Sequence, residues 1–160
     1  MKIDVLTQVG DSAVTFVRRP TPIPGDLRPQ WRVGLLLLLF DSCYGRTATP
    51  QQLHILDWVA RDSHLHNDFS SMLHGERTVG DRFVRIDPAL TRAVNFASAC
   101  GLIARDGSTR TRRTELGVEI VAEISRDKEL YTSERSFLSS LPRKLSSTMA
   151  DRLFEVRRQS

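Results

Sequence analysis

Residues 87–124 read DPALTRAVNFASACGLIARDGSTRTRRTELGVEIVAEI, and the order of local signals in this stretch decides the fold. Asp87 followed by Pro88 is an N-cap followed by a first-turn proline, which predicts a helix over 88–100. Gly101 is the expected C-terminal cap of that helix. Three-and-four spacing predicts that one set of side chains in this helix points inward: Leu90, Val94, Ala97 and Cys100 or Gly101. The set expected to point outward is Thr91, Arg92, Asn95 and Ser98.

A short hairpin and a second helix follow in the same stretch. Asp106-Gly107-Ser108 is a turn signal, so Leu102–Arg105 and Arg110–Arg113 are expected to pair as two strands. The second helix is predicted to begin at about Thr114. Its apolar side chains, which are expected to be buried, are Leu116, Ile120, Val121 and Ile124.

Two helices are predicted upstream of this stretch. Over Trp31–Tyr44, leucine occurs on more than one side of each helical turn, which is typical of a helix that is buried on two faces. Its apolar run, Val33–Phe40, is much shorter than the roughly 20 residues that span a bilayer, so no membrane contact is expected. The next helix, Pro50–Arg61, has an N-cap at Thr49 and a capping-box glutamine at Gln52.

The first thirty residues and the segment 62–86 have weaker signals. Residues 1–30 contain four prolines, which favour extended structure, so an N-terminal arm is expected. Such an arm either lies as a strap on a partner subunit or is a disordered or self-packed leader. Residues 62–86 are expected to be an insertion, with one short helix over Leu65–Leu73 and a strand over Arg82–Ile86. The prolines of the arm are Pro20, Pro22, Pro24 and Pro29.

After Arg126 the sequence predicts helical, polar structure with a break at Pro142. A sparse apolar stripe runs through this C-terminal extension. The stripe has two interpretations, a lid on the core of the domain or a surface for docking a partner or a second copy, because helix-in-groove docking uses such spacing. Its members, taken as candidate partner-binding residues, are Leu138, Leu141, Leu145, Met149 and Leu153.

The overall charge permits a nucleic-acid partner without requiring one. Lys and Arg number 23 against 19 Asp and Glu, a formal charge of +4 with a pI near 9.6. Cys43 and Cys100 lie in apolar helical patterns, so each is expected to be a buried free thiol. The first twelve residues carry charged and polar side chains where a signal peptide needs an apolar core, so a cytoplasmic location is expected.

The run Gly101-Leu102-Ile103, a charged turn, and Thr114-Glu115-Leu116-Gly117 resemble the wing of winged-helix proteins. In that superfamily a recognition helix ends in a Gly-Leu-hydrophobic strand, and the wing leads back through a Thr-x-x-Gly turn into a helix. The resemblance covers about residues 31–125. It implies a mainly α fold with a small β-hairpin: a winged helix-turn-helix over 31–126 with an insertion at 62–86, an N-terminal arm over 1–30 and a C-terminal helical extension over 127–160.

A narrower resemblance concerns the whole chain. Its small size, its proline-rich leader, the Arg-Pro-x-x-Arg start at Arg28–Arg32 and the Leu-x-x-Leu-Asp-Trp pattern at Leu53–Trp58 are similar to small middle subunits of bacterial three-component ABC or Lamassu-like defence systems. In those systems a winged-helix-like subunit accompanies an SMC-like ATPase. The resemblance therefore implies an SMC-like ABC ATPase and other complex subunits as partners in antiviral defence.

Two groups of side chains are candidates for binding double-stranded DNA. The hairpin carries four arginines, which suit sequence-independent contact with phosphates, or with acidic residues of a partner protein. The outward face of helix 88–100 includes residue types that contact base edges, although it carries little charge. The hairpin candidates are Arg105, Arg110, Arg112 and Arg113, and the helix candidates are Thr91, Arg92, Asn95 and Ser98.

The histidines and nucleophilic side chains give no catalytic pattern. His64-x-His66-x-Asp68 resembles the metal-binding motif of metallo-β-lactamase-type hydrolases, but Phe69 stands where that motif needs histidine. His54, His74 and the two cysteines lack the spacing of paired zinc ligands, so no metal and no cofactor are predicted. Neither a Gly-Lys-Ser/Thr phosphate loop nor a nucleophile elbow occurs, and no enzymatic activity is predicted.

Three hypotheses follow from the sequence. The first is a noncatalytic winged-helix subunit of a DNA-associated complex, in which the hairpin touches DNA or an acidic surface while leader and tail dock an SMC-like ATPase. The second is a transcription regulator, which requires a homodimer because paired half-sites give such helices their specificity. The third is a small metal hydrolase built on the His64 region.

Overall fold

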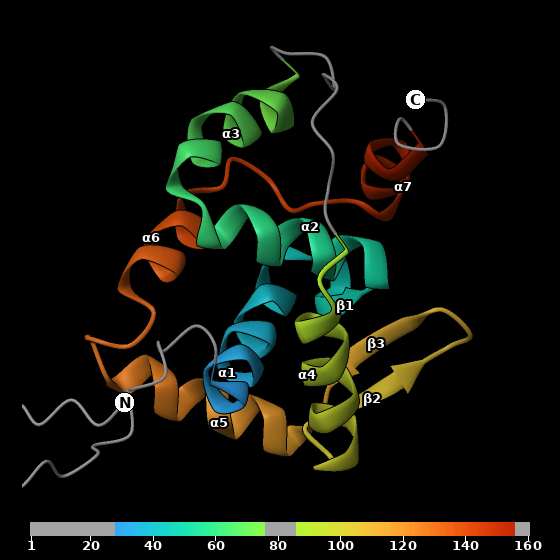
Figure 1. Cartoon of the computed structure of the whole chain (residues 1–160), viewed down its shortest axis with the longest axis vertical. Coiled ribbons are helices and arrows are strands. Elements are labelled where there is room, and N and C mark those ends of the chain that lie inside the picture. The colour runs from blue at the N-terminus through green and yellow to red at the C-terminus, as the bar shows by residue number, and fades with distance from the viewer. Residues whose placement is uncertain (1–27, 76–85, 156–160) are drawn as a thin grey trace, which may run out of the picture.

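The computed structural model describes residues 28–75 and 86–155, and this part of the chain is mainly helical with one small antiparallel sheet (Figure 1). Its helices and strands follow one another in this order: α1 (Pro29–Leu39), the 3-10 turns η2 (Phe40–Ser42) and η3 (Tyr44–Arg46), β1 (Thr47–Ala48), α2 (Pro50–Arg61), the 3-10 turn η4 (Ser63–Leu65), α3 (His66–His74), α4 (Pro88–Ala99), β2 (Ile103–Asp106), β3 (Arg110–Arg113), α5 (Glu115–Arg126), α6 (Thr132–Ser140) and α7 (Ser147–Glu155).

The predicted hairpin forms and gains a third strand. β2 and β3 pair antiparallel with Ile103 opposite Arg113 and Asp106 opposite Arg110. β1 pairs antiparallel with the other edge of β3, so the strand order is β1-β3-β2. The sequence did not predict β1, because a two-residue strand is too short to show an alternating pattern.

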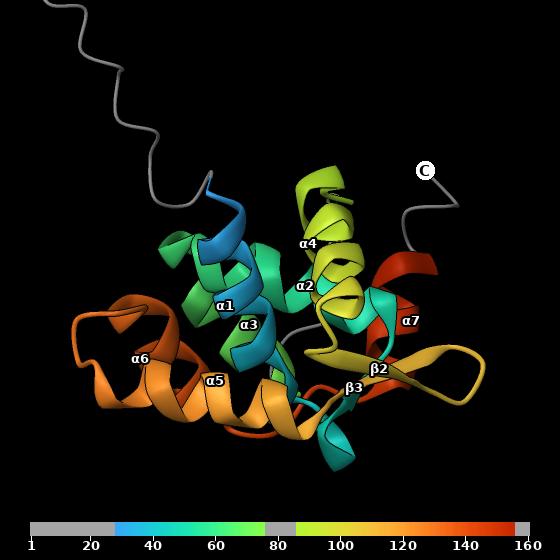
Figure 2. The ribbon, with the colours of Figure 1, turned by 90° about the horizontal axis from the view of Figure 1, so that it is seen from below.

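α1 is the centre of the core, as its leucines predict. Residues 35, 36, 37 and 39 are fully buried leucines, and α2, α4, α5 and α6 all pack against the helix. Figure 2 shows α1 enclosed by the neighbouring helices, while the β2–β3 hairpin projects away from them. α1 ends at Leu39 and not at Tyr44, because the chain turns there into η2. Among the described residues, no helix is both long and apolar enough to cross a membrane.

α2 begins as predicted from its capping box. The Thr49 hydroxyl accepts from the Gln52 N–H at 3.3 Å, and the Gln52 side-chain oxygen accepts from the Thr49 N–H at 2.8 Å. The same glutamine donates to the Leu145 carbonyl at 2.7 Å. The Gln52 side chain therefore both caps α2 and holds the C-terminal part of the chain against it.

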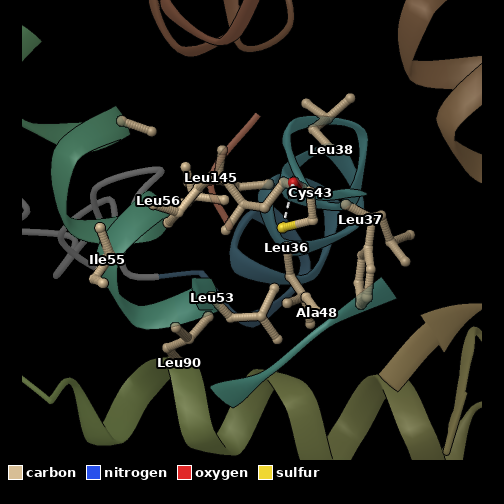
Figure 3. Packing of buried hydrophobic residues seen from close by; sticks show 14 of the residues in the cluster. Leu36, Leu37, Leu38, Cys43, Ala48, Leu53, Ile55, Leu56, Leu90 and Leu145 are labelled. Carbon is tan, nitrogen blue, oxygen red and sulfur yellow. Dashed lines mark hydrogen bonds between the residues drawn. The ribbon is translucent and has the colours of Figure 1, made fainter. Parts of the chain in front are cut away.

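The C-terminal segment is part of the core and not a free appendage. Leu145 and Cys43 form an isolated parallel bridge, in which the Leu145 N–H donates to the Ser42 carbonyl at 2.9 Å. Figure 3 shows Leu145 beside Leu56 and Cys43 in the buried cluster. The stripe predicted as a partner surface thus covers the protein's own core, which is the lid interpretation: Leu145 and Leu153 are buried, and Leu138, Leu141 and Met149 are partly buried against the same cluster.

α5 and the end of α4 depart from the predicted burial. α5 turns Gly117 and Ile124 towards the core, so Leu116 and Ile120, which were expected to be buried, are 46% and 36% exposed. Periodicity gave the helix correctly but could not show that only one narrow side of it is covered. Cys100, at the C-cap of α4, is exposed, whereas Cys43 is buried as expected.

Several boundaries also differ from the sequence-based expectation. Pro29 is the first residue of α1 and belongs to the helix instead of the arm, since a proline at the first helical position loses no hydrogen bond. The short helix expected over Leu65–Leu73 is α3, displaced by one residue. The rest of the arm, residues 1–27, lies outside the described residues, and so does most of the strand expected over Arg82–Ile86.

Gly34 gives a direct test of the packing around α1. A Cβ at this position would lie 2.1 Å from the Tyr131 hydroxyl, which donates to the Trp31 carbonyl at 2.8 Å. We expect Gly34→Ala to lower the free energy of unfolding by about 2 kcal/mol through overpacking. In a Tyr131→Phe background, which removes the nearest atom, the same change should cost clearly less. Equal losses of stability in the two backgrounds, measured by urea unfolding, would contradict this contact.

Candidate nucleic-acid interface

The N-terminus of α4 is held by a network of alternating charges, which we call the Arg32 network: Arg32, Asp57, Arg61 and Asp87. The Arg32 guanidinium contacts Asp57 at 2.9 Å and Asp87 at 2.7 Å. Arg61 contacts the same two carboxylates at 3.0 and 3.2 Å. Because Asp57 is almost fully buried, its charge requires these partners. The network thereby joins α1, α2 and the start of α4.

Asp87 is also the N-cap of α4, as the sequence predicts. Its carboxylate accepts from the Ala89 N–H at 2.8 Å, and its own N–H donates to His54 Nδ1 at 3.3 Å. Burial alone would raise the pKa of Asp87, but the Ala89 hydrogen bond and the Arg32 and Arg61 charges outweigh it, so the pKa lies below its usual 3.8. The ionised carboxylate is therefore the form that the fold stabilises.

The outward face of α4 is where the sequence placed it. All four predicted helix residues, Thr91, Arg92, Asn95 and Ser98, are exposed, while Leu90, Ala93 and Ala97 are buried against the core. Phe96 lies among the outward residues and is 53% exposed, which the spacing argument did not single out. Within the part of the chain that the structure describes, one largely polar face of α4 is thus exposed, with a single cation on it.

The junction from α4 through the hairpin to α5 is fixed by hydrogen bonds of the backbone and of the Thr114 hydroxyl. Gly101 has a φ of +70°, and the Leu102 N–H donates back to the Ala97 carbonyl at 2.9 Å, which closes α4 in a Schellman motif. Thr114 caps α5 by accepting from the Gly117 N–H, and its hydroxyl donates to the Gly101 carbonyl at 2.6 Å. A Cβ on Gly117 would lie 2.2 Å from the Leu102 carbonyl oxygen, which explains the glycine of the Thr-x-x-Gly turn.

The four hairpin arginines divide into two classes. Arg105 and Arg112 are exposed and available to a ligand. Arg113 is buried: its guanidinium donates to the Leu37 carbonyl at 3.2 Å and to the Asp41 carboxylate at 3.1 Å. Arg110 is half-buried and donates to the Thr47 carbonyl at 3.3 Å. Arg113 was therefore wrongly predicted as a surface contact, because its register opposite Ile103 points it to the core.

The histidine cluster does not assemble into a ligand set. His64 is exposed in η4, whereas the ring of His66 stacks on Phe137 with a centroid separation of 3.9 Å. Asp68 lies in the first turn of α3. Within the described ranges, no group of three or more His, Cys, Asp or Glu side chains is placed to hold a metal ion.

Comparison of the chain with models of protein families, with curated proteins and with solved structures found no match. The geometry of the chain itself is therefore the basis for the functional argument.

Stability depends on pH through His54, whose Nδ1 accepts from the Asp87 N–H. Burial lowers the pKa of His54 below 6.5, by more than Asp57 and Asp87 raise it. The neutral imidazole of His54 thus contributes its full stabilisation above pH 6.5. This contribution is lost as the pH falls towards and through the lower pKa of the folded state. We expect thermal stability to drop between pH 7 and pH 5. His54→Asn keeps an acceptor for the Asp87 N–H but cannot titrate, so its stability should be flatter over this range; an identical profile would contradict the assignment.

Proposed function

We propose that this chain is a noncatalytic winged-helix subunit of a cytoplasmic, DNA-associated complex, with the outward face of α4 and the exposed hairpin arginines towards double-stranded DNA. The observation that carries the proposal is the free polar face of α4 beside a projecting hairpin. The elements follow one another along the chain as α1-β1-α2-α4-β2-β3, and the strands lie in the order β1-β3-β2, which supports a winged helix. Residues 62–86, which include α3, are then inserted between its second and third helices.

The chemistry of this face favours backbone contact over sequence recognition. Arg92 is its only cation, and Arg105 and Arg112 lie on the strands of the hairpin. Arginine donors on a projecting element suit phosphate oxygens, which position a protein on a duplex without selecting a sequence. A helix that recognised an operator would present more side chains able to bind base edges.

The proposed role within a complex requires a surface for protein partners. With the stripe of the C-terminal segment buried, that role falls to the exposed apolar side chains of α5. Leu116 and Ile120 lie one turn apart on one flank of the helix, and Val118, 49% exposed, lies on another. We propose that the partner seated on this flank is an SMC-like ABC ATPase of a bacterial anti-phage defence assembly, following the resemblance of the whole chain.

The DNA contact is tested by pairing a surface variant with a buried one. Arg92→Gln with Arg105→Gln should weaken binding to a random-sequence duplex roughly tenfold and reduce its salt dependence, because phosphate contacts release counterions. The melting temperature should stay near that of the wild type. Arg113→Gln should instead cost roughly 2 kcal/mol of stability, since it removes buried hydrogen bonds to a charged group. Undiminished duplex binding by the Arg92/Arg105 variant would move the DNA contact off this face.

A dimer with strong preference for one sequence would favour the alternative of a transcription regulator, whose specificity comes from paired half-sites.

The partner surface is tested by coexpression with the neighbouring genes. Leu116→Asp with Ile120→Asp should abolish copurification of an ATPase subunit, because charges in an apolar contact are costly to desolvate. Leu130→Asp is the matched control, since Leu130 is a similarly exposed leucine, at 42%, outside α5. Copurification that survives the double change, or a wild-type chain that elutes alone, would count against the complex.

A further inference from the structure

A second basic surface is built around the turn that connects α1 to β1. Within η3, Gly45 and Arg46 both have left-handed backbone conformations, with φ of +66° and +54°. Arginine adopts this region rarely, so the surrounding contacts must hold it there. The turn leaves the Tyr44 residue 52% exposed and the Arg46 side chain 70% exposed. It therefore exposes a tyrosine and an arginine side by side in the sequence at the surface.

The hairpin brings two further cations to this turn. Thr47, which follows the turn, is paired directly opposite Arg112, so the two side chains lie on the same face of the sheet. Arg110, two residues earlier on β3, shares that face and donates to the Thr47 carbonyl. Arg46, next to Thr47 in the chain, thus lies beside the end of β3.

The loop between α6 and α7 supplies the third part of the surface. Leu145 is hydrogen-bonded beside Cys43, so Arg143 and Lys144 lie next to the same turn, and both are exposed. Burial raises the pKa of the Cys43 thiol to about 12, while the charges of Arg110 and Lys144 both act to lower it. Arg110 and Lys144, which are far apart in the sequence, thus both lie close enough to Cys43 for their charges to affect the pKa of its thiol.

The three segments concentrate the positive charge of the chain. Residues 40–48, 110–113 and 142–146 together carry six cations and one carboxylate, Asp41, which is occupied by Arg113 and Arg46. A second carboxylate, Asp106, lies opposite Arg110 on the hairpin. With Asp106 counted beside the three segments, the cations exceed the carboxylates by four, which equals the formal net charge of the whole chain. Within the described ranges, neither Arg143 nor Lys144 makes an ion pair.

We propose that Tyr44, Arg46, Arg112, Arg143 and Lys144 form a second contact surface for the sugar-phosphate backbone of nucleic acid, which we call the turn surface. It shares only Arg112 with the hairpin contact and uses none of the outward residues of α4. Arginine, lysine and tyrosine are all side chains that donate to phosphate oxygens, and a cluster in which cations outnumber carboxylates attracts a polyanion more strongly than a surface of balanced charge.

The turn surface rests on the proposed function in one respect, since its ligand is the same DNA duplex. It extends the proposed DNA contact from the hairpin to the face formed by β1, β3 and the α6–α7 loop. The basic surface of the chain therefore extends beyond the four hairpin arginines. The pairing of β1 with β3 brings the first two segments together, and the bridge between Leu145 and Cys43 adds the third.

The test uses the full chain and a random-sequence duplex, with binding measured by fluorescence anisotropy at several salt concentrations. Arg143→Gln with Lys144→Gln should weaken binding roughly tenfold at low salt and lower the slope of log K against log salt by about 1.8, two phosphate contacts at about 0.9 each. Arg126→Gln with Lys128→Gln, exposed cations at and just after the C-terminal end of α5, is the charge-matched control and should bind as the wild type does. Arg46→Gln is a second, single variant of the turn surface and should show about half the change in slope.

The outcomes separate this inference from the proposed function. Loss of binding in the Arg92/Arg105 variant but not in the Arg143/Lys144 variant overturns the turn surface and leaves the proposed DNA contact standing. The reverse result supports the turn surface and removes the α4 face. A wild-type chain that binds no duplex overturns both. If the Arg143/Lys144 variant keeps duplex binding but loses a copurifying protein, the turn surface binds an acidic protein, and the inference is overturned. Melting temperatures within a few degrees of the wild type exclude unfolding as the cause.

Discussion

The fold depends on the charge balance of the Arg32 network. Two arginines and two aspartates from α1, α2 and the N-cap of α4 alternate in space, so each buried charge faces its opposite on two sides. Removing any one member would leave an uncompensated charge in or near the core, which costs far more than a surface ion pair gives. Leucine packing could hold these helices together at several angles. The charge network ties the N-cap of α4 to α1 and α2.

The hairpin shows that arginine content is a poor measure of a binding surface. Of four arginines within nine residues, one stabilises the end of α1 from inside, one braces β1, and two remain free for a ligand. Strand alternation separates Arg113 from its neighbour Arg112, since adjacent side chains point to opposite faces. Arg110 shares the face of Arg112 and is distinguished from it by its contact with Thr47. Meanwhile, cations that the sequence separates by many tens of residues come together at the η3 turn. Charge in this protein is arranged by tertiary structure more than by sequence clustering.

Local sequence signals predicted most of the helices and strands, whereas they did not predict the contacts between residues far apart in the sequence. The capping box of α2, the Asp87-Pro88 start of α4 and the Asp-Gly turn act within four residues, so they can be recognised in the sequence alone. Which flank of α5 is covered depends on where α1 lies, and periodicity does not contain that information. Arg32 and Asp57 were the missed signal: a charged residue inside an apolar helix, and another inside an apolar stripe, require partners of opposite charge. The lid over α2 and the burial of Arg113 likewise depend on contacts between residues far apart in the sequence: Gln52 with Leu145, and Arg113 with Leu37 and Asp41.

The bridge between Cys43 and Leu145 has a consequence for how the chain acquires its structure. This contact closes a loop of about a hundred residues, and contacts of such sequence separation form late because loop closure must precede them. During synthesis the leucines of α1 leave the ribosome long before residue 145, which helps to cover them. The nascent chain must therefore carry an incompletely covered apolar helix until this loop has been synthesised. Premature termination before the α6–α7 loop would leave that surface open to aggregation or to capture by a chaperone.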